Sequence, residues 1–298
     1  DDKLLAPEVT QDVIDDVIGK IKKAERPVLH AGYGIRLAGA YEEFRKVIEK
    51  LNIPVVTYWN AIDLIEDDNP LYVGRAGNMG DRPGNWAIQN ADLVVAIGTR
   101  ISIRQVGYNW KTWARSAEVI MVDADQAELR KPTLHVEMPL WADAKDFISK
   151  LDNAIKEPIP KKNKWVDATQ SWKKDYPVVQ PKQLEENGST ANVYASFKYI
   201  SDELPEGSLT VVSNGACCVA GHQTWTIKRG TRFHNNSAIA SMGYGLPAAI
   251  GACISNDRKD TVCLEGDGSI MMNLQELQTV ITNRLPIKLF LINNSGYH

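Results

Sequence analysis

Short apolar runs alternate with amphipathic segments along most of this chain, and this alternation constrains the fold more than any other feature. The segments 9–23 and 40–51 carry apolar residues at helical spacing. Apolar runs of strand length lie between such segments, among them RPVLHAG, ADLVVAIGT and AEVIMVDAD. Strands that are apolar on both faces are typical of parallel sheets with helices packed on either side. The pattern therefore predicts an α/β protein with doubly wound parallel sheets.

A change of composition divides the chain into two blocks. Residues 157–189 are rich in proline, lysine and polar side chains, which is typical of an interdomain linker. We therefore predict a Rossmann-like domain at 1–156 and a second parallel-sheet domain at 190–298. A length of 298 residues suits two domains of ordinary size.

Charge and cysteine content narrow the classes of partner. The net charge of −3 gives no strong field toward nucleic acid or an acidic membrane, and no apolar run is long enough to span a bilayer. None of the four cysteines (Cys217, Cys218, Cys253 and Cys263) belongs to a CxxC pair. We expect buried, reduced thiols in a cytoplasmic protein. The histidines show no zinc-ligand spacing.

An acid and an amide follow two strand-like runs near the end of the chain. TVCLEGDG places Asp267 after one run, and LPIKLFLINN places Asn294 at the end of the next. In a right-handed βαβ unit, both strand ends face the same edge of the sheet, where α/β proteins bind ligands. One carboxylate with amide and backbone carbonyl oxygens suits Mg²⁺, and it leaves the ion positive enough to take a diphosphate.

The glycines and serine beside this acid fit the same ligand. Gly266 and Gly268 let the backbone approach an anion, and Ser269 stands at the start of the helix expected over 269–283, where free N–H groups favour phosphate. Alone, GDGS is also the sequence of an ordinary capped strand-to-helix turn. The amide pair 27 residues after Asp267 favours a Mg²⁺-diphosphate site.

The wider sequence resembles a known family. GDG, 24 intervening residues and NN resemble the diphosphate-binding motif of thiamine-diphosphate-dependent enzymes. SMGYGLPAAIGA and NLQELQTVITNRLPIKLFLINN resemble the branch of acetolactate synthase and pyruvate oxidase, whose central domain is similar to PVLHAGYG, ADLVVAIGTR and VIMVDAD. The resemblance covers nearly all of 10–298. It implies the central and the C-terminal domains, the latter cut short, without the N-terminal pyrimidine-binding domain that carries the activating glutamate. Such a fragment is expected to be inactive alone.

The resemblance also implies roles for individual residues. Asp267 and Asn294 would bind Mg²⁺ through their side chains, and Gly296 through its carbonyl. Met242 matches the residue that holds the cofactor in a bent form, although core packing is the more common role of a methionine. Arg104 matches an arginine that contacts a second oxo acid. The cofactor-binding set implied is Asn214, Gly215, Ala216, Ser241, Met242, Gly266, Asp267, Gly268, Ser269, Asn294 and Gly296.

The implied activity is decarboxylation and carboligation of a 2-oxo acid by a homo-oligomer, dimer or tetramer, of the acetolactate synthase type. Acetolactate synthases also hold FAD in the central domain, where Arg100 matches a flavin-contacting arginine. The acids usual between the two arginines of that family are replaced by Ser102 and Ile103, so FAD is left open. Alternatives are a 2-oxo acid decarboxylase or a specialised carboligase with the same cofactor, and a non-catalytic nucleotide-binding module.

Overall fold

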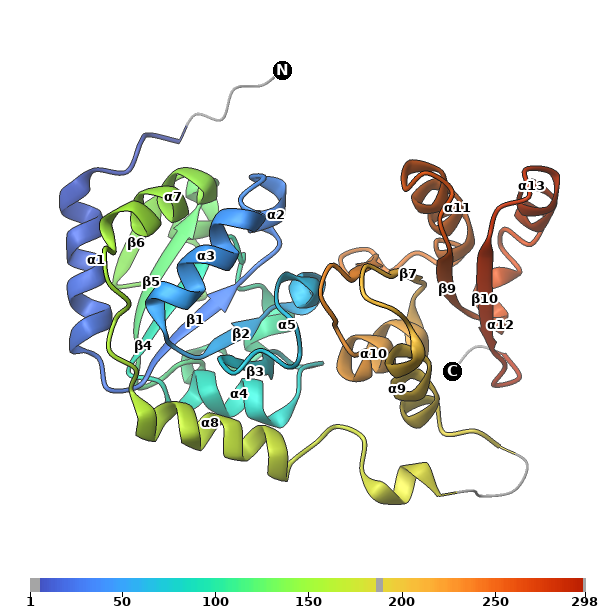
Figure 1. Ribbon diagram of the computed structural model, residues 1–298, viewed down its shortest axis with the longest axis horizontal. Coiled ribbons are helices and arrows are strands. Elements are labelled where there is room, and N and C mark those ends of the chain that lie inside the picture. The colour runs from blue at the N-terminus through green and yellow to red at the C-terminus, as the bar shows by residue number, and fades with distance from the viewer. Residues whose placement is uncertain (1–5, 186–189, 297–298) are drawn as a thin grey trace. The chain divides into compact units, whose positions relative to one another are not determined.

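The computed structural model describes residues 6–185 and 190–296, and its chain forms two compact units, Asp1–Pro177 and Val178–His298. Each unit is an α/β structure with its own parallel sheet (Figure 1). No helix within the described ranges combines the length and the apolar character needed to cross a membrane. The predicted fold class is therefore confirmed for both units.

The first unit contains, within its described residues, a six-stranded parallel sheet in the order β3-β2-β1-β4-β5-β6. Its strands are short and almost entirely apolar, and β1 and β4 are buried along their whole length, as expected for central strands of a parallel sheet. The strands are β1 (Pro27–Ala31), β2 (Val55–Thr57), β3 (Tyr72–Arg75), β4 (Leu93–Ile97), β5 (Glu118–Asp123) and β6 (Met138–Trp141).

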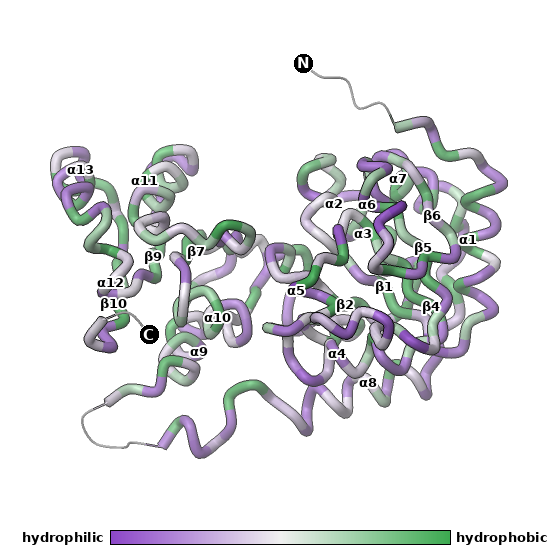
Figure 2. Tube along the Cα trace, turned by 180° about the vertical axis from the view of Figure 1, so that it is seen from behind, coloured by the Kyte–Doolittle hydropathy of each residue, from purple (hydrophilic) through white to green (hydrophobic). Residues whose placement is uncertain are grey.

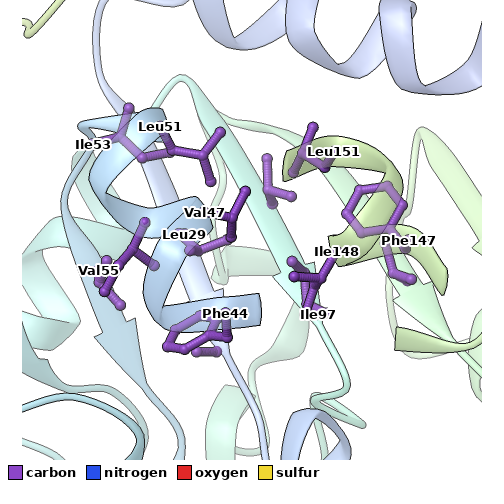
Figure 3. Close-up of a cluster of buried hydrophobic side chains, with 14 of the residues drawn as sticks. Leu29, Phe44, Val47, Leu51, Ile53, Val55, Ile97, Phe147, Ile148 and Leu151 are labelled. Atoms are coloured by element: carbon purple, nitrogen blue, oxygen red, sulfur yellow. The ribbon is translucent and has the colours of Figure 1, made fainter. Parts of the chain in front are cut away.

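Helices cover both faces of this sheet. On one face, Phe44 from α3 (Tyr41–Leu51) and Phe147 from α7 (Ala144–Ala154) pack on Leu29 of β1 (Figure 3). On the other face, α4 (Arg82–Asn90) packs on Val28, the neighbour of Leu29 in the strand. Successive strand residues point to opposite faces, so both cores follow from the same apolar run. The other helices of this unit are α1 (Gln11–Lys23), α2 (Gly34–Leu37), η1 (Trp59–Leu64), α5 (Ile103–Val106), η2 (Trp110–Thr112), α6 (Gln126–Arg130) and α8 (Asn163–Asp175).

The hydropathy of the trace follows this layering. Strands β4 and β5 are mostly green in Figure 2, whereas α1 alternates between green and purple. In α1, the buried residues are Ile14, Val17, Ile18 and Ile21, which recur at helical spacing. The amphipathic segment predicted at 9–23 is therefore confirmed as a helix that covers the sheet.

The expected linker at 157–189 is wrong over its first half. Helix α8 occupies 163–175 and belongs to the first unit, which extends to Pro177. Trp165 of α8 is 6% exposed, and its Nε1 donates a hydrogen bond to the Pro27 carbonyl at 3.0 Å. The low average hydropathy of this segment concealed an amphipathic helix that buries Trp165, Val166 and Thr169. Residues 186–189 of the expected linker lie outside the described residues.

The second unit holds, over the residues described, a four-stranded parallel sheet in the order β10-β9-β7-β8. Its strands are β7 (Leu209–Val212), β8 (Arg232–Asn235), β9 (Thr261–Gly266) and β10 (Ile287–Ile292). The predicted strands at LTVVSNG, RFHNN, TVCLEGDG and LPIKLFLINN are confirmed. The helical elements are η3 (Pro181–Leu184), α9 (Val193–Glu203), α10 (Gly215–Thr224), α11 (Gly245–Ser255), α12 (Asp267–Ile270) and α13 (Glu276–Thr282).

Two local features of this unit differ from the prediction. The single helix expected over 269–283 consists of α12 and α13, separated by a turn at 271–275. Helix α10 was not predicted, because GACCVAGHQT has apolar residues on all sides and so lacks helical periodicity. Both features lie at the carboxyl ends of strands, where they shape the candidate site.

Candidate functional site

The site begins with the pairing of two parallel strands. Strands β9 and β10 are neighbours, and their register places Gly266 opposite Ile292. Asp267 therefore leaves β9 at the same sheet edge at which Asn294 follows β10. The loop after β10 turns sharply, with Ser295 at φ 67° and Gly296 at φ 131°. This turn brings the backbone back toward Asp267.

The carboxylate of Asp267 joins the two loops. Its Oδ1 accepts a hydrogen bond from the Gly268 N–H at 2.7 Å, and its Oδ2 accepts one from the Gly296 N–H at 3.0 Å. Each oxygen keeps lone pairs for a further partner. The acid is thus fixed in direction before any ligand binds, which lowers the ordering cost of binding.

The side chain of Asn294 faces the same point. Its inward-facing amide atom lies 2.9 Å from the Gly296 carbonyl oxygen and 3.0 Å from Asp267 Oδ1. If that atom is Nδ2, it donates to both oxygens. If it is Oδ1, it lies within 3.0 Å of two other oxygens. Neighbouring ligands of an octahedral Mg²⁺ with bonds of about 2.0–2.1 Å lie roughly 2.8–3.0 Å apart, so the observed spacing fits that ion.

A cavity of about 350 Å³ opens beside this cluster. Its lining includes every cofactor-binding residue predicted from the sequence except Ser241. Two further residues, Cys217 and Ile292, were not predicted. The lining residues are Asn214, Gly215, Ala216, Cys217, Met242, Gly266, Asp267, Gly268, Ser269, Ile292, Asn294 and Gly296.

The opposite wall is the first turn of α10. Asn214 ends the loop after β7, and Gly215 begins the helix at φ 58°, a conformation that glycine adopts without strain. The Asn214 side chain does not cap the helix but donates to the Ala240 carbonyl at 3.0 Å. Gly215, Ala216 and Cys217 thus present a helix N-terminus to the cavity, which favours an anion there.

The charge of the cavity is distinctive. Asp267 is the single charged residue among the described residues that line it. Burial raises the pKa of the Cys217 thiol to about 12, so this thiol is neutral near pH 7. Since none of these described lining residues is a lysine or an arginine, a diphosphate would rely on backbone N–H groups and on a cation that it shares with Asp267.

Ser269 lines the cavity and also makes two contacts within the fold. It is 6% exposed, and its hydroxyl oxygen accepts a hydrogen bond from the Gly243 N–H at 2.8 Å. The same hydroxyl lies 2.9 Å from that of Ser213. It therefore joins β7, the turn before α11 and the GDGS turn. Helix α12 has four residues, too few to supply the phosphate-binding N-terminus expected at Ser269.

A buried acid next to the site was missed. Glu265 of β9 is fully buried, and its Oε2 accepts a hydrogen bond from the Leu246 N–H at 3.2 Å. It thereby satisfies a backbone N–H in the first turn of α11. The available signal was a carboxylate inside the apolar strand TVCLEG, since buried acids are rare unless they have partners.

The residues predicted in the first unit have local partners. The Arg104 guanidinium lies over the Trp59 ring, 5.6 Å from its centroid, and Arg100 pairs with Glu128. Gly32 and Gly34 have no space for a side chain, since an added Cβ would lie 2.2 Å and 2.6 Å from the Gly98 backbone. Close packing of two loops explains these glycines without a bound flavin.

Comparison with known proteins agrees with this arrangement. Residues 14–151 match the family model "Thiamine pyrophosphate enzyme, central domain", and residues 213–298 match "Thiamine pyrophosphate enzyme, C-terminal TPP binding domain". The chain belongs to the thiamine pyrophosphate enzyme family. The first match lies in the first unit and the second in the second unit.

Within this family, the chain is similar to large subunits of acetolactate synthase. It is 32% identical to the probable large subunit from Methanococcus aeolicus, over 94% of this chain and 48% of the relative. It is 30% identical to the isozyme 1 large subunit from Escherichia coli, over 99% and 51%, and 30% identical to chloroplastic acetolactate synthase 1 from Zea mays, over 98% and 45%. The chain spans about half the length of these curated relatives.

Proposed function

We propose that this chain is part of an enzyme that uses thiamine diphosphate and Mg²⁺ to decarboxylate a 2-oxo acid and join the product to an acceptor, as its acetolactate synthase relatives suggest. The observation that carries this proposal is the convergence of the Asp267 carboxylate, the Asn294 side-chain amide and the Gly296 carbonyl at a cavity with no cationic side chain among its described lining. Such a cavity suits a metal-bound diphosphate.

The residues divide into two groups by chemistry. Asp267, Asn294 and the Gly296 carbonyl would hold Mg²⁺, and the single carboxylate leaves the ion a net positive charge for the diphosphate. The GDGS turn, including Gly266, Gly268 and Ser269, and the first turn of α10 would enclose the diphosphate with backbone groups. We include no flavin, because the glycines of the first unit are explained by packing.

The apolar side of the cavity would receive the rest of the cofactor. Met242 is 38% exposed at the rim, unusual for a long apolar side chain and favourable for contact with an aromatic ring. When bound, the cofactor would supply a thiazolium ring whose positive charge takes up the electron pair released as a 2-oxo acid loses CO2. The described residues of this chain bind and orient that cofactor and keep its charged end fixed.

We extend the proposal to assembly and location. Exposed apolar side chains in the second unit, including Ile239, Met271 and Ile281, support a homo-oligomer, dimer or tetramer. None of the four cysteines forms a disulfide and all are buried, which supports a reducing compartment such as the cytoplasm. Arg104 stays a proposed contact for an oxo acid.

Titration calorimetry tests the cofactor assignment. Thiamine diphosphate is titrated into the complete polypeptide that carries this chain, with and without Mg²⁺, beside an Asp267→Ala variant. We expect Mg²⁺-dependent binding that the variant loses. Binding of ADP but not of thiamine diphosphate would instead support a non-catalytic nucleotide-binding module.

Product analysis then separates the enzyme classes. With pyruvate as substrate, acetolactate would support the carboligase. Acetaldehyde and CO2 without acetolactate would contradict that assignment and support a simple decarboxylase.

A further inference from the structure

The turn before α11 is held by both polar groups of one glycine backbone. The Gly243 N–H donates to Ser269 Oγ at 2.8 Å, and the Gly243 carbonyl accepts a hydrogen bond from Asn273 Nδ2 at 2.7 Å. Both partners lie in the segment that follows β9, the same segment that carries Asp267. Gly243 therefore has hydrogen bonds to two points of this segment, one in the GDGS turn and one in the turn at 271–275.

A third hydrogen bond fixes the backbone just after this turn, at the start of α11. Leu246 donates its N–H to the buried carboxylate of Glu265 at 3.2 Å. The backbone at Gly245 packs closely against Glu265, since an added Cβ at Gly245 would lie 2.3 Å from Glu265 Oε2. At Gly243, where φ is 76°, an added Cβ would lie 2.7 Å from Asn273 Nδ2. An added Cβ at either position would therefore push a neighbouring side chain aside, and the positive φ at Gly243 further favours glycine there.

Met242 lies inside this fixed turn and lines the same cavity as Asp267 and Gly268. Its side chain is the flexible apolar element at the rim, whereas the side chains of Asp267 and Asn294 are polar. A ligand with a diphosphate at one end would meet Asp267 with that end and Met242 with its apolar part. The hydrogen bonds of Gly243 therefore link the backbone next to Met242 to the segment that carries Asp267.

We propose that Asn273 is a positioning residue that fixes Met242 relative to the Asp267 turn, with Ser269 and Glu265 as its structural partners. This inference rests on the proposed function, because it assigns the two ends of the cavity to two parts of thiamine diphosphate. Asn273 lines no part of the cavity and acts through the Gly243 backbone. Its side-chain amide donates to the Gly243 carbonyl, which is not part of a helix or a strand.

Two ligands distinguish positioning from general destabilisation. Inorganic diphosphate with Mg²⁺ probes only the Asp267 end, whereas thiamine diphosphate with Mg²⁺ probes both ends. In the complete polypeptide, Asn273→Ala should weaken thiamine diphosphate binding roughly three- to tenfold, the range of one hydrogen bond. Binding of inorganic diphosphate should change less than about twofold. Calorimetry gives both dissociation constants.

A matched control and a conservative variant complete the test. Asn283 also donates its side-chain amide to a backbone carbonyl, that of Thr279 at 2.9 Å, but it is exposed at the C-terminal end of α13. Asn283→Ala should leave both affinities unchanged. If Asn273→Ala does not fold, Asn273→Asp keeps the size and removes the donor, and it should give the same difference between the two ligands.

A double-mutant cycle with Met242→Ala tests the route of the effect. If Asn273 acts by placing Met242, Asn273→Ala should cost little further affinity once Met242 is alanine. Full additivity would overturn the inference, as would equal weakening of both ligands or no weakening of either. Failure of the unaltered protein to bind either ligand would instead overturn the proposed function, and the inference with it.

Discussion

The side-chain amide of Asn294 lies 3.0 Å from Oδ1 of Asp267, although the two residues are 27 positions apart in the sequence. This contact joins the loops after two neighbouring parallel strands. An amide at position 294 keeps the pair at a single negative charge. A second acid at position 294 would place two negative charges next to each other, so the fold would need a bound cation to reach its usual stability.

Asn294→Asp should make folding depend on Mg²⁺. Two carboxylates about 3 Å apart repel, which should lower the free energy of unfolding by about 1–4 kcal/mol without the ion. Millimolar Mg²⁺ should recover most of that loss, since it binds the folded state. Thermal unfolding with and without Mg²⁺ measures this. Asn293→Asp is the matched control, and an equal Mg²⁺ response in both variants would contradict the site.

Two glycines of α11 should respond oppositely to alanine. Gly245→Ala places a Cβ against the buried Glu265 carboxylate and should destabilise the fold by about 1–3 kcal/mol. Gly251→Ala meets nothing within 4 Å and should stabilise the helix by about 0.5–1 kcal/mol. Urea unfolding of the two variants gives the comparison. A neutral Gly245→Ala would mean that Glu265 can move aside.

His30 should make the first unit sensitive to acid. It lies fully buried near Tyr58 and Trp113, and burial lowers its pKa to about 3. In the unfolded chain the pKa is about 6.5. Between these values the unfolded state binds the extra proton, so stability falls with decreasing pH by up to about 1.4 kcal/mol per pH unit.

The comparison with His30→Phe isolates this effect. Burial also raises the pKa of Asp81 to about 6, which favours the folded state as pH falls through that value and so opposes the histidine. Urea unfolding of both proteins between pH 4 and pH 7 removes the Asp81 contribution by difference. Parallel stability curves for the two proteins would show that His30 takes up a proton without unfolding.

Trp165 should be essential to the first unit although it lies in the lysine-rich segment. Trp165→Ala removes a buried indole and its bond to the Pro27 carbonyl, and should cost about 3–5 kcal/mol. Trp110 is 37% exposed and serves as the control. Trp110→Ala should lower the free energy of unfolding by much less. Denaturant unfolding measures both. Equal losses of stability in the two variants would mean that residues 163–175 do not contribute to the core of the first unit.

Much of the site could be predicted from the sequence. Apolar runs before Asp267 and Asn294 predicted strands, and the right-handed crossover rule placed their ends at one edge. Helix α8 was not predicted, because its tryptophans stand among lysines that lower the average hydropathy. The bonds of Glu265 and Asn273 were not predicted either, since they join positions 19 and 30 residues apart across turns without a periodic pattern.

The sequence by itself determined the elements and the residue types at the sheet edge, because strand and helix periodicity is a short-range property of the chain. The tertiary structure decided the distances. The register of β9 and β10, together with the positive φ of Ser295 and Gly296, brings the Asp267 carboxylate, the Asn294 side-chain amide and the Gly296 carbonyl to the spacing that suits a small cation. Such spacing depends on hydrogen bonds between segments far apart in the chain, and local sequence patterns do not encode it.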